Sequence, residues 1–245
     1  MNETILWKKG DTICSLILKI IALLASCYGM VRTFSGPAFF TFFTNLSNIF
    51  IDMVMLAFIG QDIQMLQSGG KKPLPNGWYV VKFMATISIT LTFLVYLLLL
   101  APTNENGIIY SYFHNGGGSF GVHFVAPVLA IVDFILFDYR MKSSRKHLFF
   151  AVIPPLCYVG LVVILAAFGM RWYGNMYAPY NFLNFGAPTG WFGFDLSQMG
   201  SYSLGIGVFY MIMVLLIIFL GIGRCFLGLQ KLCRKRILSE NVPVV

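Results

Sequence analysis

Six apolar stretches, each about as long as a membrane-spanning helix, dominate the sequence. About 20 mostly apolar residues are enough to cross the hydrocarbon core of a bilayer. Only 11% of the residues are charged, against about 25% in soluble domains, so lipid must cover part of the apolar surface. We therefore predict an all-α, polytopic membrane protein, a single transmembrane domain with a bundle of about six helices. The stretches cover residues 11–34, 38–59, 78–101, 119–138, 148–169 and 201–223.

The basic residues predict the orientation of these helices. Thirteen Lys and Arg residues fall on one side of the predicted membrane, and only Arg32 and Arg171 fall on the other. Cytoplasmic loops carry the excess of Lys and Arg, so we predict cytoplasmic N- and C-termini in the cell membrane. Residues 224–245 then form a basic cytoplasmic tail. The net charge of +8 comes from helix ends and this tail, so it reflects membrane orientation and not nucleic-acid binding.

Cysteine usage and motif content narrow the classes of function. The five cysteines are scattered and odd in number, which predicts no disulfide framework. The sequence contains neither zinc-type cysteine pairs nor a glycine-rich phosphate loop. We therefore expect no metal ion and no other cofactor.

Polar side chains within the predicted spans are the candidates for function, because they must face protein or water and not lipid. Thr44 and His123 lie roughly 9 and 6 Å below the predicted outer face, at 1.5 Å per residue. A hydroxyl beside an imidazole can act as a nucleophile whose proton the imidazole accepts. Asn45 or Asn48 can supply an amide donor for an oxyanion, and Ser47 can orient them. The same residues can equally join membrane helices through hydrogen bonds.

Two further features are predicted from position and composition. Lys19, Asp52 and Asp133 lie at similar depths, roughly 10–12 Å from the inner helix ends, so we expect a buried charge network. Residues 170–200 are rich in aromatic residues, Gly, Pro and Asn and carry almost no charge. This composition is typical of a packed lid at the membrane interface rather than of a disordered linker, and the lid includes Tyr180, Asn181 and Asn184.

Three segments occur in the order and spacing of motifs from a known family. They are Phe43-Thr44-Asn45-Leu46-Ser47-Asn48, the block from Val122 to Pro127 with Val132 to Asp138, and Ala178-Pro179-Tyr180-Asn181-Phe182-Leu183-Asn184. They resemble, in turn, [YF]-[FL]-T-x-x-[SN]-N, H-x-x-x-P…D-W-x-L-F and Y-P-F-L-D of the bacterial Pr6Pr family of six-helix membrane proteins. Here Phe134 replaces the Trp, Asn181 the Pro and Asn184 the Asp.

The resemblance implies a function. Pr6Pr proteins are similar to the androgen-induced-gene (FAR-17a-like) and androgen-dependent TFPI-regulating proteins of animals, which are membrane threonine hydrolases. Those enzymes cleave fatty acid esters of hydroxy fatty acids with one intramembrane Thr and one intramembrane His, which match Thr44 and His123. Thr41, three residues earlier, is the alternative nucleophile.

Two functions are therefore open. The first is a lipid esterase with Thr44 as nucleophile and His123 as base, acting on a fatty-acid ester from the surrounding membrane lipids. The second is a non-enzymatic lipid-binding or transport protein that uses the same cavity. Small transporters usually contain internal repeats and broken helices, and the absence of a clear repeat in the sequence favours the enzyme.

Overall fold

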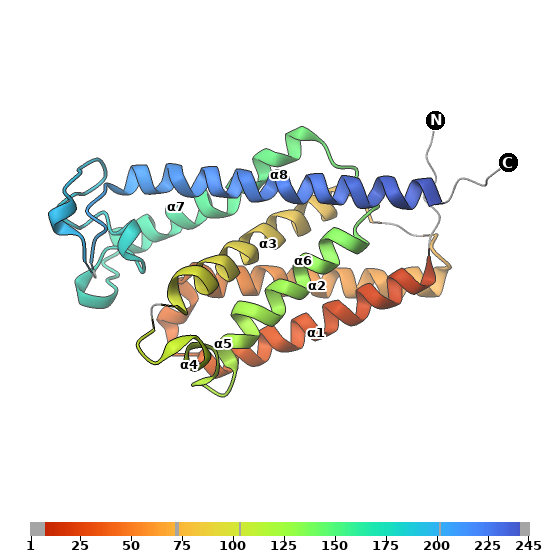
Figure 1. Cartoon of the computed structure of the whole chain (residues 1–245), viewed down its shortest axis with the longest axis horizontal. Helices are drawn as coiled ribbons and strands as arrows, with labels where there is room; N and C mark the ends of the chain where they lie inside the picture. Colours follow the sequence, from red (N-terminus) through yellow and green to blue (C-terminus); the bar gives the residue numbers. More distant parts are fainter. Residues whose placement is uncertain (1–7, 72–73, 103, 201, 241–245) are drawn as a thin grey trace. The chain divides into compact units, whose positions relative to one another are not determined.

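The computed structural model describes residues 8–71, 74–102, 104–200 and 202–240. In this part of the chain six helices are long and apolar enough to cross a membrane, and the β structure consists of isolated bridges only. The predicted all-α, multi-pass membrane class is confirmed (Figure 1). The six helices cover Lys9–Thr33, Phe43–Ser68, Asn76–Leu98, Gly118–Phe137, Arg145–Ala167 and Val208–Ile237.

The chain divides into two compact units, and the first is a four-helix bundle. This unit comprises residues 1–151 and 223–245. Helices α1 and α3 each pack against both α2 and α6, so the four helices surround a common core. They span Lys9–Thr33 (α1), Phe43–Ser68 (α2), Asn76–Val95 (α3) and Ala126–Phe137 (α6).

Helix α2 is longer than its apolar stretch predicts. It continues to Ser68, past the predicted end at residue 59. Gly69 then adopts the left-handed region (φ 62°), and the Gly70 N–H donates to the Met65 carbonyl at 2.9 Å. Glycine in this conformation is a common helix terminator. Hydropathy marks where lipid contact ends, whereas the glycine pair sets where the helix ends, so the predicted boundary was wrong.

Widened helical turns occur at two places in the first unit. Tyr96–Leu100 (η2) continues α3, and Gly121–Val125 (η3) precedes α6, both as π-helix. Pro127 has no N–H for the His123 carbonyl, which removes an α-helical bond at η3. Single π-helical turns within helices are frequent at functional sites. Two short helices, α4 (Gly107–Phe113) and α5 (Gly118–Phe120), precede η3.

Glycine permits α1 to approach α5 and η3 closely. A Cβ added to Gly121 would lie 2.5 Å from the Ala25 carbonyl oxygen, and one added to Gly29 would lie 2.6 Å from the Gly118 oxygen. Contacts of this kind are too short for any side chain, so these glycines set the distance between the two backbones. Small residues are the usual means of close helix packing in membranes.

The second unit, residues 152–222, contains α7, the long loop that follows it, and the start of α8. Helix α7 spans Ile153–Ala167 and begins at a Pro pair, where proline is well tolerated. In the loop, Ala178 and Leu183 are buried, and Trp172 and Met176 are joined by a backbone bridge. The segment 177–185 is packed rather than extended into solvent, with every residue buried or half-buried.

Helix α8 spans Val208–Glu240 and so extends through most of the predicted tail. The tail boundary at residue 223 is therefore corrected, and residues 241–245 lie outside the described part of the chain. The buried Gln230 explains the continuation, because its side-chain amide donates to the carbonyls of Asp138 (2.8 Å) and Met141 (3.2 Å). Arg234 also donates to the Met141 carbonyl at 3.2 Å.

Candidate functional site

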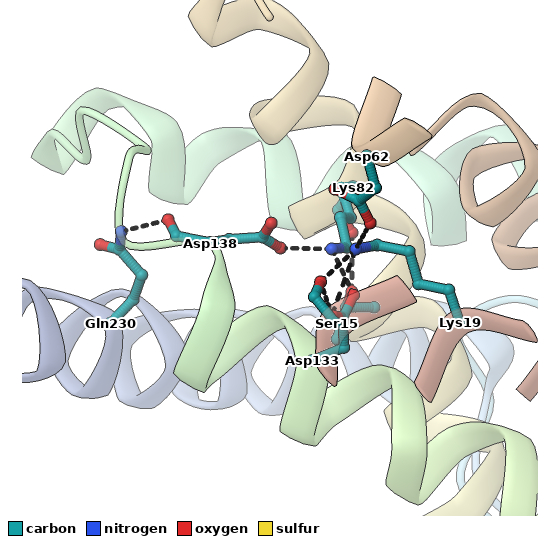
Figure 2. Close-up of polar contacts among 8 residues, drawn as sticks. Ser15, Lys19, Asp62, Lys82, Asp133, Asp138 and Gln230 are labelled. Carbon is teal, nitrogen blue, oxygen red and sulfur yellow. Dashed lines mark hydrogen bonds and ion pairs between the residues drawn. The ribbon is translucent and has the colours of Figure 1, made fainter. Parts of the chain in front are cut away.

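A cluster of charged side chains occupies the core of the four-helix unit (Figure 2). The Lys19 ammonium lies 2.7 Å from Asp62 Oδ2 and 3.3 Å from Asp133 Oδ1. The Ser15 hydroxyl, which also contacts Lys19, donates to Asp133 Oδ1 at 2.5 Å. Lys19 and Asp133 are at most 1% exposed. Ion pairing and hydrogen bonding are the conditions under which charges are tolerated at such burial.

A second lysine completes the cluster. Lys82 of α3 lies 2.5 Å from Asp133 Oδ2 and 2.6 Å from Asp138 Oδ2. Its ammonium also lies 4.5 Å from the centroid of the Phe58 ring, within the range of a cation–π contact. Asp133 thus pairs with both lysines through different oxygens, and it joins α1, α3 and α6. We call Lys19, Asp62, Lys82, Asp133 and Asp138 the charge cluster.

The structure places Asp52 outside the charge cluster. Lys19 does pair with Asp133, as predicted, but Asp62 stands where Asp52 was expected. Asp52 instead accepts a hydrogen bond from Ser26 at 2.8 Å. Ten residues of helix separate Asp52 from Asp62, about 15 Å along the axis. The depth of Asp52 was misjudged because α2 ends at Ser68, so its inner end lies farther from Asp52 than predicted.

Three members of the charge cluster were missed by the sequence analysis. Lys82 lies within the predicted span 78–101, and an ionisable residue inside a span marks a site by default, so this signal was present. Asp62 fell beyond the predicted end of its helix, and Asp138 was the last residue of its span. Only the tertiary arrangement shows that both face the lysines.

A small polar cavity leads to the charge cluster from one end of the bundle. It has a volume of about 40 Å³ and is lined by residues from the start of α1, the end of α2, the start of α3 and the end of α6, including Asp11, Lys19, Asp62, Tyr79 and Asp138. A space of this size holds a few water molecules. These are the helix ends predicted to face the cytoplasm. Water in this cavity can hydrate the charged groups that line it.

The predicted catalytic residues lie at the other end of α2 and in η3. Thr44 is in the first turn of α2, and its carbonyl accepts a hydrogen bond from Ser47 at 2.8 Å. The Ser47 hydroxyl is also 2.9 Å from that of Thr92 on α3. One turn farther along the chain, at the start of η2, the Tyr96 ring stacks on His123 with centroids 3.7 Å apart and planes 7° apart. The Thr44 backbone is thus linked to α3 through Ser47, and among the described residues no hydrogen bond joins the side chains of Thr44 and His123.

Two enclosed polar atoms in this region have no hydrogen-bond partner among the described residues, namely His123 Nδ1 and the Tyr112 hydroxyl. The centroid of the Tyr112 ring lies 5.1 Å from that of Tyr96, which stacks on His123. Both unpartnered atoms therefore belong to side chains that contact Tyr96. Tyr96 itself donates to the Ser111 carbonyl at 2.7 Å. Burial raises the pKa of Tyr112, which keeps its phenol protonated and able to donate. An unpartnered buried polar atom calls for an explanation, and a catalytic role is one.

The predicted oxyanion donors are engaged in structural bonds. Asn45 donates to the Phe39 carbonyl at 2.7 Å and Asn48 to the Thr44 carbonyl at 2.9 Å. Asn48 also accepts a bond from Ser26 at 3.1 Å. With Ser47, these residues hold the first turns of α2 against their neighbours. Tyr112 was not singled out from the sequence, because a Tyr between two predicted membrane spans carries no pattern that indicates a site.

The predicted lid residues shape the loop between α7 and α8. Asn184 is buried and uses both ends of its amide, accepting from the Tyr177 N–H (2.9 Å) and donating to the Tyr202 carbonyl (2.8 Å). Asn181 donates to the Gly200 carbonyl at 3.4 Å. The Tyr180 ring stacks on Phe182 at 5.2 Å. Asn184 therefore joins two parts of the loop, near residues 177 and 202.

Comparisons with known proteins assign no function to this site. No family model matches the chain, and neither a curated protein nor a solved structure matches it. The resemblance to Pr6Pr proteins rests on the sequence motifs alone. Among the described residues, no group of three or more His, Cys, Asp or Glu side chains is arranged to hold a metal ion.

Proposed function

We propose that the protein is an intramembrane hydrolase of fatty-acid-type esters in the cell membrane, with Thr44 as nucleophile and His123 as general base. The observation that carries the proposal is the enclosed Nδ1 of His123, which has no partner among the described residues. A general base needs a free lone pair. Stacking on Tyr96 and the π-helical turn at η3 support the proposal, because they fix the plane of the imidazole.

The chemistry follows from these two groups. The Thr44 hydroxyl attacks the ester carbonyl while His123 accepts its proton. The tetrahedral intermediate then expels the alcohol, which takes the proton back from the imidazolium, and an acyl-threonine remains. Water, activated by His123, releases the fatty acid and restores Thr44. Tyr112 supports the intermediate, because its protonated and unpartnered hydroxyl can donate to the oxyanion.

Ester hydrolysis by the purified protein tests this proposal. In nanodiscs, the wild type should hydrolyse a palmitoyl ester of hydroxystearate. Thr44→Ala and His123→Ala should each lower the rate by about 100-fold or more, which is typical for loss of proton transfer. Thr44→Ser should retain part of the activity, because the hydroxyl remains.

Thr41→Ala is the matched control. Thr41 lies three residues from Thr44, but its hydroxyl donates to the Ala38 carbonyl at 2.7 Å and is already engaged. This variant should keep the activity of the wild type. Loss of activity in Thr41→Ala with full activity in Thr44→Ala would make Thr41 the nucleophile. A wild type that retains lipid through purification but hydrolyses no ester would favour the lipid-binding function.

A further inference from the structure

The loop between α7 and α8 forms an open cavity at the surface of the second unit, and this cavity plays no part in the proposed hydrolysis. Its volume is about 410 Å³, within the range of about 300–1,000 Å³ that is usual for ligand pockets. Every residue that lines it belongs to the second unit, so the cavity is formed within the loop itself. The polar side chains of the lining are Asn175, Tyr177, Asn184, Gln198, Tyr202 and Ser203.

The walls of the cavity are held by the loop's own contacts. Asn184 ties the backbone of Tyr177 to that of Tyr202. The two tyrosine rings also lie close against glycine backbone, since a Cβ on Gly174 would be 2.0 Å from the Tyr202 ring and one on Gly186 would be 2.1 Å from the Tyr177 ring. The cavity therefore has a defined shape before any ligand is bound, which lowers the entropic cost of binding.

Polar groups remain available on these walls. Asn175, Tyr177 and Tyr202 line the cavity, and none of their side chains makes a hydrogen bond to another described residue. Asn175 has a φ of 67°, a left-handed conformation that Asn tolerates better than most residues. Together they offer amide and phenol groups that both donate and accept, beside aromatic faces.

The cavity carries no charge. Its lining contains neither acidic nor basic residues, and the loop from residue 170 to 207 has only two charges, Arg171 and Asp195. The Arg171 guanidinium donates to the carbonyls of Ala166 and Met170 and lies 3.8 Å from the Tyr177 ring centroid. Asp195 Oδ1 accepts hydrogen bonds from the N–H (3.0 Å) and the hydroxyl (2.6 Å) of Ser197, which lower the pKa of this carboxyl, and Asp195 does not line the cavity. The lining therefore offers a charged ligand no group of opposite charge.

We propose that this cavity binds a neutral, hydroxyl-rich ligand, namely a carbohydrate, either free or as the headgroup of a glycolipid. Sugar hydroxyls match amide and phenol groups, and the C–H faces of a sugar ring pack on tyrosine. The proposal does not depend on the hydrolase function, because it uses no residue of the Thr44 and His123 region.

Saturation-transfer NMR with maltose as the probe tests the proposal. The full-length protein is placed in phosphatidylcholine nanodiscs without alkyl maltoside detergents, because their headgroups are themselves maltose. We expect transfer from the wild type to maltose, reduced at least fivefold in Tyr202→Ala. Tyr173 is an exposed tyrosine of the same loop and does not line the cavity. Tyr173→Ala should therefore show the same saturation transfer to maltose as the wild type.

A variant that fills the cavity tests whether the loss of transfer in Tyr202→Ala comes from the cavity itself. A Cβ on Gly200 would meet no atom within 4 Å, so Gly200→Trp can fill the cavity without moving the backbone, and it should also abolish transfer. Doping the discs with monoglucosyl diacylglycerol separates the two sources: suppressed transfer assigns the site to the headgroup, and unchanged transfer assigns it to free sugar. Equal transfer from all variants, none from the wild type, or equally strong binding of glucose 1-phosphate would overturn the proposal.

Discussion

At the scale of single residues, Asp133 is the point on which the buried charges converge. One of its oxygens faces Lys19 and Ser15, and the other faces Lys82. Two lysines and three aspartates in the charge cluster leave an excess of one negative charge, if all are ionised, so each lysine is needed to offset the carboxylates. Removing one partner of a buried ion pair destabilises a protein far more than replacing both partners by apolar residues.

Lys82→Met should therefore destabilise the protein by about 3–5 kcal/mol. The substitution keeps the length of the side chain but leaves Asp133 and Asp138 without this cation. Unfolding in detergent, followed by thermal or denaturant titration, measures the loss. Lys142→Met is the control, because Lys142 is exposed and should change little. If the two variants are equally stable, the ion pairs of Lys82 do not stabilise the bundle.

The sequence indicated part of these residue contacts. Depth along the predicted helices brought Lys19 to the level of Asp133, because the rise per residue of a helix is constant. The same reasoning misplaced Asp52, since it depended on where α2 ends and the apolar stretch ended before the helix did. The orphan atoms of His123 and Tyr112 could not be foreseen, because hydrogen-bond satisfaction is a property of the packed structure.

At the scale of elements, the close packing of α1 against η3 positions His123. Gly121→Ala should destabilise this contact by about 1–3 kcal/mol, the usual cost of forcing an extra carbon into a packed interface. The added Cβ would lie 2.5 Å from the Ala25 carbonyl oxygen. Gly160→Ala is the matched control, because a Cβ on this α7 glycine meets no atom within 4 Å. It should be neutral or stabilising, since Ala favours helix over Gly by about 1 kcal/mol.

Thermal unfolding of the two variants checks this prediction, and their ester hydrolysis gives a second readout. Gly121→Ala should also lower the rate, because it displaces the turn that holds the imidazole. Equal stability of both variants would show that η3 can move away from α1 at no cost. The helices themselves were predictable from apolar runs of sufficient length, whereas the π-helical turns were not, since only Pro127 hinted at an irregular turn.

At the scale of the whole molecule, membrane orientation is the property the sequence predicts most directly. The charge asymmetry predicts that the loop at residues 104–106 lies outside and that the segment at residues 143–146 lies inside. A variant without its five native cysteines is the starting point, because four of them are exposed. In intact cells, Glu105→Cys should react with a membrane-impermeant maleimide, and Ser144→Cys should react only after permeabilisation. The reverse pattern would invert the topology.

The central claim, that Thr44 is a nucleophile, is tested most directly by locating a covalent adduct. An alkyl fluorophosphonate reacts with an activated hydroxyl, which displaces fluoride and forms a stable phosphonate ester. Incubation of the purified protein with this probe, followed by proteolysis and mass spectrometry, identifies the modified residue. We predict an adduct on Thr44 in the wild type that is lost in His123→Ala, because the base activates the hydroxyl. An adduct on another residue, or one on Thr44 that forms equally fast without His123, would contradict the account.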